Sequence, residues 1–444
     1  MNKMLIQPKY QSENANAPIA LGELPVEIGF GGKSVHASGR LELRLLPENR
    51  VLISVHSDHY DQFPAFGHDA TMIRVGDTAK PVPAFALKSN HSSSGVNIEY
   101  LPKISRITLC RDRRVRLRAA DFHMINFPEF FSTGAGGTDL AYENAGNHMR
   151  LGHVRLTNGE WAIDLHALPN TNKLVKQLKE DGGYAITHVG RLARSDGKAF
   201  GVGATERALN QLSTFLSFAQ GAWTPVFGVT GVSKNDQIVY EDLSMRLSSR
   251  WQATRGWFDV HHGECLAQVY PGFTALLEDA NLGPAASRAI YWYLRGNRAG
   301  AGVDSALLLA QAALESLSYA VLPRMGLSSA GNAADRIRRL LEAHGIPTAL
   351  PKSASRLRSA KRAGIWKDGP DAVVKIRNEL VHPGKRLSIK IGPCVSEAWR
   401  LAQWYIEMLI LRLSGFSGVY SNQLNPRWVG EVEQVPWAKS SRKQ

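Results

Sequence analysis

Residues 304–322 read DSALLLAQAALESLSYAVL and decide the fold of the C-terminal half. The segment is apolar on most of its circumference and has no internal Gly or Pro, which predicts one long buried helix. We expect Asp304 to cap it and Pro323 to end it. Helical patterns continue on both sides with short connections, which predicts an all-α helical bundle over residues 283–420 and a tail over 421–444. The other expected helices are 285–298, 332–344, 370–382 and 393–413, with the basic connector at 352–362 as a candidate short helix.

The N-terminal half has the alternating pattern of strands. Residues 40–56, RLELRLLPENRVLISVH, are two alternating runs joined by Pro-Glu-Asn, which predicts a hairpin. One helix is expected at 205–219, ending at Gly221. The chain is therefore predicted to be multidomain α+β: a mainly β sensing or regulatory domain over residues 1–230, a mixed connector over 231–282, and the bundle. Further strands are expected at 104–118, 151–156, 160–166 and 184–194.

The positive charge is concentrated in one part of the chain. The 444 residues carry a net charge of +14, of which residues 288–400 supply +11 and residues 1–287 only +1. A concentrated positive field attracts polyanions, so nucleic acid is the leading partner class, with solubility or an anionic surface as the alternative.

The remaining composition points to a cytoplasmic location. The three cysteines are far apart and lack metal-type spacing, which favours a reducing compartment. The sequence shows neither a signal-peptide pattern nor an uninterrupted apolar span, so we expect a cytoplasmic protein that does not enter a membrane.

Three Arg-x4-His pairs occur in the sequence. Arg118 and His123 lie on strand-like sequence, where Arg118 belongs to a polar face. In the second pair, Arg339 is expected to face solvent and His344 to pack at a helix end. These two pairs are interpreted as structural.

The third pair, Arg377 and His382, has a different context. At 100° per residue, Arg377 lies in the middle of an apolar stripe, where an unpaired charge would cost several kcal/mol. His382 precedes Pro383 and should leave the helical conformation, which lets it turn back toward Arg377. The alternative is that Arg377 forms a buried ion pair with Glu315 and that His382 only ends the helix.

The segment Ile376-Arg-Asn-Glu-Leu-Val-His-Pro resembles the signature of HEPN domains, and its place before a long last helix is similar too. A large β-rich part joined to such a domain resembles the ApeA family of abortive-infection antiphage defence. The resemblance implies a homodimer, formed through the bundle, in which Arg377 and His382 of two chains line one catalytic cleft. It also implies a phage-derived trigger at the N-terminal domain.

By analogy with the family, Asn378 would orient the histidine or the phosphate. Glu315 is a candidate supporting residue. Lys375, Lys385 and Arg386 flank the motif and could hold the backbone of the RNA, which could be tRNA or another structured RNA. Each of these side chains could equally be an ordinary polar surface group.

The expected chemistry follows from the residue types. The ribose 2′-OH attacks the adjacent phosphorus, histidine transfers protons, and a guanidinium stabilises the charge on the phosphoryl oxygens. The products are a 2′,3′-cyclic phosphate and a 5′-OH, without a metal or other cofactor. The alternatives are a non-catalytic RNA- or nucleotide-binding module and a scaffold of a defence complex.

Two further clusters are candidates for metal binding. His56, Asp58 and His59 lie close together in sequence, as do His261, His262, Glu264 and Cys265. Neither has a recognised ligand spacing, so packed or surface histidines are the favoured interpretation.

Overall fold

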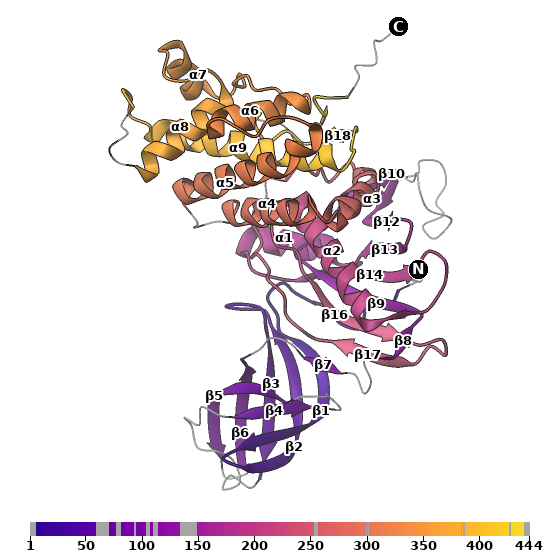
Figure 1. The fold of residues 1–444 in the computed structure, drawn as a ribbon. Coiled ribbons are helices and arrows are strands. Elements are labelled where there is room, and N and C mark those ends of the chain that lie inside the picture. Colours follow the sequence, from indigo (N-terminus) through magenta and orange to yellow (C-terminus); the bar gives the residue numbers. More distant parts are fainter. Residues whose placement is uncertain are drawn as a thin grey trace.

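The computed structural model describes residues 6–438 except 59–70, 77–80, 93–94, 104–106, 110–113, 134–148, 253–255, 299, 301, 383, 385–386 and 426–427. The molecule is elongated and has three tiers: a barrel at one end, a large antiparallel sheet in the middle and a group of helices at the other end (Figure 1).

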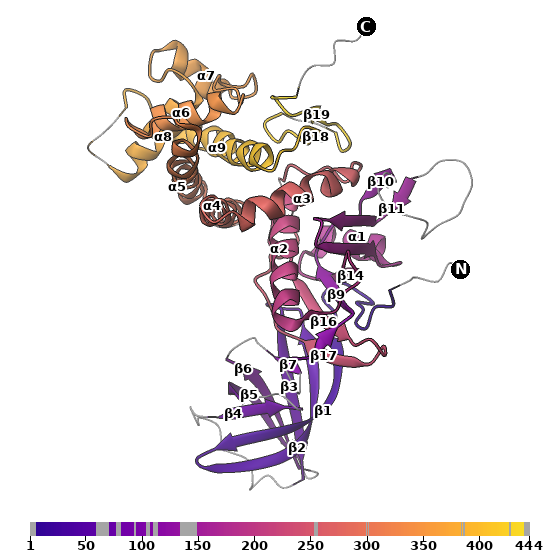
Figure 2. The same ribbon diagram turned by 45° about the vertical axis from the view of Figure 1, so that its right-hand side comes forward.

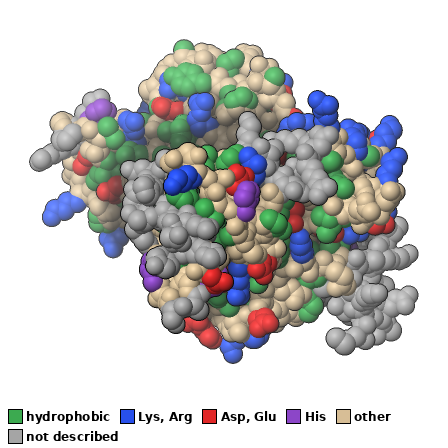
Figure 3. All heavy atoms as spheres, turned by 90° about the horizontal axis from the view of Figure 1, so that it is seen from below, with side chains coloured by type: hydrophobic (Ala, Val, Ile, Leu, Met, Phe, Trp, Pro, Cys, Tyr) green, Lys and Arg blue, Asp and Glu red, His purple; other side chains and the backbone are tan. Residues whose placement is uncertain are grey.

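The barrel is closed by six antiparallel strands in the order β1-β2-β3-β6-β5-β4. The predicted hairpin at 40–56 is confirmed, because Leu43 of β2 lies opposite Val51 of β3. Alternate residues such as Leu41 and Ile53 point into the barrel core. On the face seen from below in Figure 3, Lys and Arg are scattered among Asp and Glu. The strands are β1 (Ile19–Phe30), β2 (Lys33–Arg44), β3 (Arg50–Ser57), β4 (Met72–Val75), β5 (Val82–Ser92) and β6 (Gly95–Pro102).

The middle tier is a seven-stranded antiparallel sheet in the order β12-β13-β14-β9-β16-β17-β7. Its strands are β12 (His153–Thr157), β13 (Trp161–Ala167), β14 (Ile186–Arg194), β9 (Ala119–Ile125), β16 (Val226–Val232), β17 (Ile238–Asp242) and β7 (Thr108–Leu109). Helix α1 (Thr171–Asp181) connects β13 to β14. Two small strand pairs flank the sheet: β10 (Phe131–Thr133) with β11 (Met149–Leu151), and β15 (Phe200–Gly201) with β8 (Arg116–Leu117).

The two faces of this sheet belong to two different cores. Phe122 and Met124 of β9 face the core that contains α2 (Val202–Gln220). Ile125 of the same strand faces the core of the barrel, as the period of two in a strand requires. The N-terminal segment lies on the barrel side, where the Tyr10 backbone N–H donates to Nε2 of His123 at 3.1 Å. Near Ile125 the sheet is therefore buried on both faces.

The helical tier begins with α3 and ends in a short hairpin, β18 (Val419–Tyr420) with β19 (Glu433–Gln434). The predicted helices after residue 283 are confirmed with ends that differ by a few residues. Asp304 is not the cap of α5, because Gly302 holds that position and Asp304 lies in the first turn. The helices are α3 (Glu264–Glu278), α4 (Gly283–Gly296), α5 (Val303–Val321), the 3-10 turn η2 (Pro323–Met325), α6 (Ala333–Ala343), α7 (Ser355–Arg362), α8 (Gly369–Val381) and α9 (Gly392–Leu413).

The predicted fold class, a mainly β N-terminal domain followed by an all-α bundle, is wrong. One continuous hydrophobic core runs from the sheet through α2 into the helices, so the helices are not a separate all-α unit. Phe218 of α2 packs against Phe273 of α3 and Tyr293 of α4, with ring centroids 5.8 and 5.7 Å apart. The chain also returns to β structure after α9, where Trp404 Nε1 donates to the Tyr420 hydroxyl at 3.0 Å.

The residues 303–325 around α5 form the one described segment that is long and apolar enough to cross a membrane. Of its most apolar window, 56% is buried inside the protein. A core helix satisfies the same length and composition requirements, so this segment is weak evidence for a membrane span.

A cluster of buried polar side chains lies between α4 and α9. The Tyr293 hydroxyl donates to Oε1 of Glu407 at 2.6 Å, and Gln403 Nε2 donates to Oδ1 of Asn297 at 3.2 Å. Glu407 Oε2 and Gln403 Oε1 are buried without a hydrogen-bond partner among the described residues. Burial raises the pKa of the Glu407 carboxyl to about 8, since desolvation penalises the carboxylate form.

The raised pKa of Glu407 predicts a pH-dependent stability. Between about pH 5 and pH 8 the folded state holds a proton that the unfolded state has released, so stability falls as the pH rises through this window. Glu407→Gln should remove this dependence and raise Tm relative to wild type at pH 8 but little at pH 5. Thermal unfolding at both pH values, with the exposed Glu342→Gln as control, tests this. Equal pH dependence in wild type and Glu407→Gln would contradict it.

Candidate functional site

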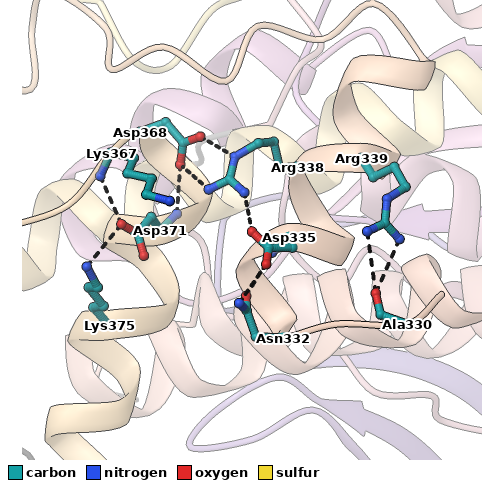
Figure 4. Close-up of polar contacts among 9 residues, drawn as sticks. All are labelled: Ala330, Asn332, Asp335, Arg338, Arg339, Lys367, Asp368, Asp371 and Lys375. Atoms are coloured by element: carbon teal, nitrogen blue, oxygen red, sulfur yellow. Dashed lines mark hydrogen bonds and ion pairs between the residues drawn. The ribbon is translucent and has the colours of Figure 1, made fainter. Parts of the chain in front are cut away.

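The helix that carries the Arg-x4-His motif, α8, is fixed at its start by a network of charged residues (Figure 4). Asp368 caps the helix by accepting a hydrogen bond from the Asp371 backbone N–H at 3.0 Å. Arg338 of α6 donates to both carboxylate oxygens of Asp368 and to Asp335. The hydrogen bond with Asp368 is the largest reason that the pKa of the Arg338 guanidinium is raised. This network ties α6 to α8 and fixes the direction of α8.

Lys375, a predicted RNA-binding residue, already has two partners. Its Nζ lies 3.1 Å from Oδ2 of Asp371, one turn earlier, and donates to the Ile365 carbonyl at 2.8 Å. The ammonium therefore links α8 to the segment before it. Lys385 and Arg386, the other two predicted RNA-binding residues, lie outside the described residues, as does Pro383.

Arg377 lies in the last turns of α8 and is half-buried. Its Nη1 donates to Oδ1 of the neighbouring Asn378 at 3.2 Å. Its Nε is buried and has no acceptor, and no carboxylate of a described residue lies within ion-pair distance of the guanidinium. The guanidinium therefore has donors available for an anion from outside.

The alternative interpretation, a buried pair between Arg377 and Glu315, is wrong. Glu315 of α5 accepts instead from Nη2 of Arg336, which lies on α6, at 3.3 Å. The same guanidinium stacks over the Tyr319 ring, 4.5 Å from its centroid. Glu315 therefore links α5 to α6 and forms no hydrogen bond with Arg377.

His382 ends α8 in the way that the following proline predicts. Its backbone has left the helical region, with φ of −121° and ψ of 87°, while its N–H donates to the Asn378 carbonyl at 2.8 Å. The side chain is exposed, and the preceding Val381 is 40% exposed. No hydrogen bond within the described part of the chain joins the His382 ring to Arg377. The structure therefore brings Arg377 and Asn378 into contact and leaves His382 open to solvent at the same helix end.

Glu379 is a residue of this site that the sequence interpretation missed. Its Oε2 accepts a hydrogen bond from the Leu387 backbone N–H at 2.9 Å. The contact holds Leu387 against the last turn of α8. Its sequence signal was a carboxylate between the two motif residues, in a segment otherwise rich in positive charge.

The other two Arg-x4-His pairs are structural, as predicted. Arg118 is an exposed partner of Asp236, and His123 is buried, which lowers its pKa to about 4. Arg339 donates to backbone carbonyls, including that of Ala330 (Figure 4). Burial also lowers the pKa of His344.

The candidate metal clusters do not converge. His56 Nε2 lies 3.1 Å from Asp58 Oδ1 on an exposed surface, while His59 is outside the described residues. The His262 ring lies 3.3 Å from Glu264, the His261 ring lies 3.5 Å from Asp259, and the Cys265 thiol donates to the Val419 carbonyl. Within the part of the chain that the structure describes, no group of three or more His, Cys, Asp or Glu side chains could hold a metal ion.

Two parts of the chain match known protein families. Residues 112–254, which include most of the sheet, match the family described as YopA central domain, and residues 279–434 match the YopA C-terminal domain. Nearly the whole chain is similar to the SPbeta prophage-derived uncharacterized protein YopA of Bacillus subtilis (strain 168). The two are 28% identical over 459 residues, which cover 98% of this chain and 99% of the relative. No solved structure matches the chain.

The anchoring of α8 gives a prediction about stability. Arg338→Ala removes a largely buried guanidinium from two carboxylates and should lower the free energy of unfolding by roughly 1–3 kcal/mol. The matched control is Arg339→Ala, because among the described residues this half-buried neighbour bonds only to backbone carbonyls and forms no ion pair, so it should change stability by less than about 0.5 kcal/mol. Chemical denaturation of both variants tests the difference, and an equal loss would contradict the anchoring role.

Proposed function

We propose that this protein is a metal-independent endoribonuclease that acts as a homodimer with Arg377 and His382 as its catalytic residues. We further propose that it is an antiphage abortive-infection effector. The observation that carries the proposal is the state of Arg377: a half-buried guanidinium with no carboxylate partner among the described residues, one turn from an exposed histidine. A charge is seldom left unpaired in such a position unless it serves a ligand.

The charge of the surrounding segment supports the same substrate class. Residues 288–400 carry a net charge of +11, and the motif lies within them. The resemblance of Ile376–Pro383 to the HEPN signature adds to this argument. The proposal rests on the motif and its surroundings and not on the overall fold, since the helices share their core with the sheet.

The chemistry requires a base, an acid and a group that stabilises negative charge. One His382 takes the proton from the ribose 2′-OH as this oxygen attacks the adjacent phosphorus. A second His382, from the partner subunit in the dimer, gives a proton to the departing 5′-oxygen. Arg377 stabilises the extra charge on the phosphoryl oxygens, and Asn378 holds the guanidinium through its Oδ1. The products are a 2′,3′-cyclic phosphate and a 5′-OH.

The dimer would form around the end of α8. Val381 is exposed directly before His382, so an apolar contact between two copies at this point would bring the two histidines together. The N-terminal barrel is the proposed sensor of a phage-derived trigger, because it lies at the end of the molecule opposite the helices (Figure 1). The prophage named in the description of the Bacillus relative supports a role in the contest between phage and host.

Substitution of the two motif residues tests the proposed activity. Arg377→Ala and His382→Ala should each abolish cleavage of total cellular RNA in EDTA, because one removes charge stabilisation and the other removes proton transfer. Mapping the fragment ends should show cyclic phosphates and 5′-hydroxyls in wild-type digests only.

The matched control is Arg339→Ala, which changes the arginine of a structural Arg-x4-His pair and should cut like wild type. Circular dichroism should show that all three variants are folded. If Arg377→Ala and His382→Ala both cut RNA at the wild-type rate in EDTA, the proposal is wrong. Binding of RNA without any cleavage by the wild type would favour a non-catalytic module.

A further inference from the structure

The short helix α7 and the residues around it form a strongly basic surface that the proposed active site does not use. We call this the α7 surface; it consists of Lys352, Arg356, Arg358, Lys361, Arg362 and Lys367, all exposed. Residues 351–367 contain no Asp or Glu. No ion pair joins any of these six side chains to another described residue.

The fold fixes this surface in one orientation. Helix α7 buries Leu357 and Ala360, so its cationic side chains must point outward. Trp366 Nε1 donates to the Leu357 carbonyl at 2.9 Å, which holds the segment after α7 against the helix. The helix is therefore anchored on its apolar side and free on its charged side.

The acidic group next to α7 is occupied. The Glu397 carboxylate of α9 accepts from the backbone N–H groups of Arg356 and Leu357, at 3.2 and 2.9 Å. It thus caps the start of α7 and does not pair with a cationic side chain. Asp368, which follows the surface in sequence, is bonded to Arg338. The positive charge of the α7 surface is left for a partner from outside.

We propose that the α7 surface binds the phosphate backbone of the RNA that the α8 site cuts, an inference that rests on the proposed function. Helix α7 lies at the outer end of the helices, against α9 and far from the barrel (Figures 1 and 2). Helix α8 starts two residues after Lys367, and Arg377 lies eight residues further on, about 12 Å along the helix axis. The end of α8 that follows the α7 surface in sequence therefore lies about 12 Å from Arg377 along the helix axis, a span that one short structured RNA can cover.

The chemistry of the surface favours RNA over an anionic membrane. Helices that bind membranes insert an exposed apolar face, whereas the apolar residues Leu357 and Ala360 of α7 are buried in the protein. The exposed polar residues among the cations are Ser353, Ser355 and Ser359. Their hydroxyl groups can bond to phosphate oxygens and ribose hydroxyls.

The test compares two triple variants with the same change in charge. The first, Arg358→Gln/Lys361→Gln/Arg362→Gln, alters the α7 surface. The control, Lys173→Gln/Lys176→Gln/Lys179→Gln, alters three exposed lysines of α1, which lies against the sheet. The probe is a fluorescein-labelled 2′-O-methyl RNA hairpin, which lacks the attacking hydroxyl and cannot be cut. Its binding to the full-length protein is measured by fluorescence anisotropy from about 50 to 300 mM salt.

The α7 variant should bind the hairpin at least about tenfold more weakly than wild type. The slope of its log affinity plotted against log salt concentration should be less steep by about two to three. The α1 variant should bind within about twofold of wild type. Wild-type affinity in the α7 variant, or an equal loss in both variants, would overturn the inference. The inference would also be overturned if the same three residues bound duplex DNA or phosphatidylserine vesicles more tightly than RNA.

A second assay separates this inference from the proposed function. A dinucleotide can occupy the α8 site without reaching α7, so the α7 variant should cut a dinucleotide at the wild-type rate while cutting the unmodified hairpin more slowly. If the wild type cuts no RNA and the α7 variant binds the hairpin more weakly than the wild type, the α7 surface is an RNA-binding surface and the nuclease proposal fails. If the wild type cuts RNA and the α7 variant binds normally, the nuclease stands and this inference fails.

Discussion

The structure depends on the burial of α2 between the sheet and the helical tier. Its aromatic residues point away from the sheet into α3 and α4, where Phe215 meets Tyr270 and Phe218 meets Phe273 and Tyr293. An aromatic cluster of this size contributes several kcal/mol through area burial and ring contacts. It makes one core of the sheet and the helices, and so it determines where α5, α8 and α9 can lie. The position of the Arg377 motif follows from this packing.

The sequence predicts the elements better than their assembly. The helix at 370–382 and the hairpin at 40–56 are recovered because their apolar periodicity is local. Helix α3 was missed because Pro271 lies inside it and its sequence resembled a connector. The shared core could not be predicted, because the sequence shows that Phe218 and Phe273 are apolar but does not show which residues they pack against.

In the candidate site, too, local features could be predicted from the sequence and contacts between elements could not. The release of His382 from the helix follows from the next residue being proline, and the structure has that conformation. The partner of Glu315 depends on the packing of α5 against α6, and there Arg336 lies closer than Arg377. A wheel diagram treats one helix at a time and cannot decide between two arginines on different helices. Glu379 was missed for a related reason, since its partner Leu387 lies across a loop.

The closed barrel has a consequence for how this architecture can diversify. Each of its six strands pairs with a neighbour on both sides, although β4 covers only Val26–Gly29 of β1 and Val82–Pro83 of β5. The barrel precedes the residues that match the YopA central and C-terminal domains. Its contacts with the rest of the protein include an apolar region with Ile125, Val189 and Phe227, and hydrogen bonds from Ser248 to Asn49 and from Arg250 to the Pro47 carbonyl. Loops and outer strand faces away from that region can therefore change, or the whole barrel can be exchanged for another with a similar docking face, without disturbing the helices. The architecture thus permits the barrel to change while the packing of the helices at the far end stays constant.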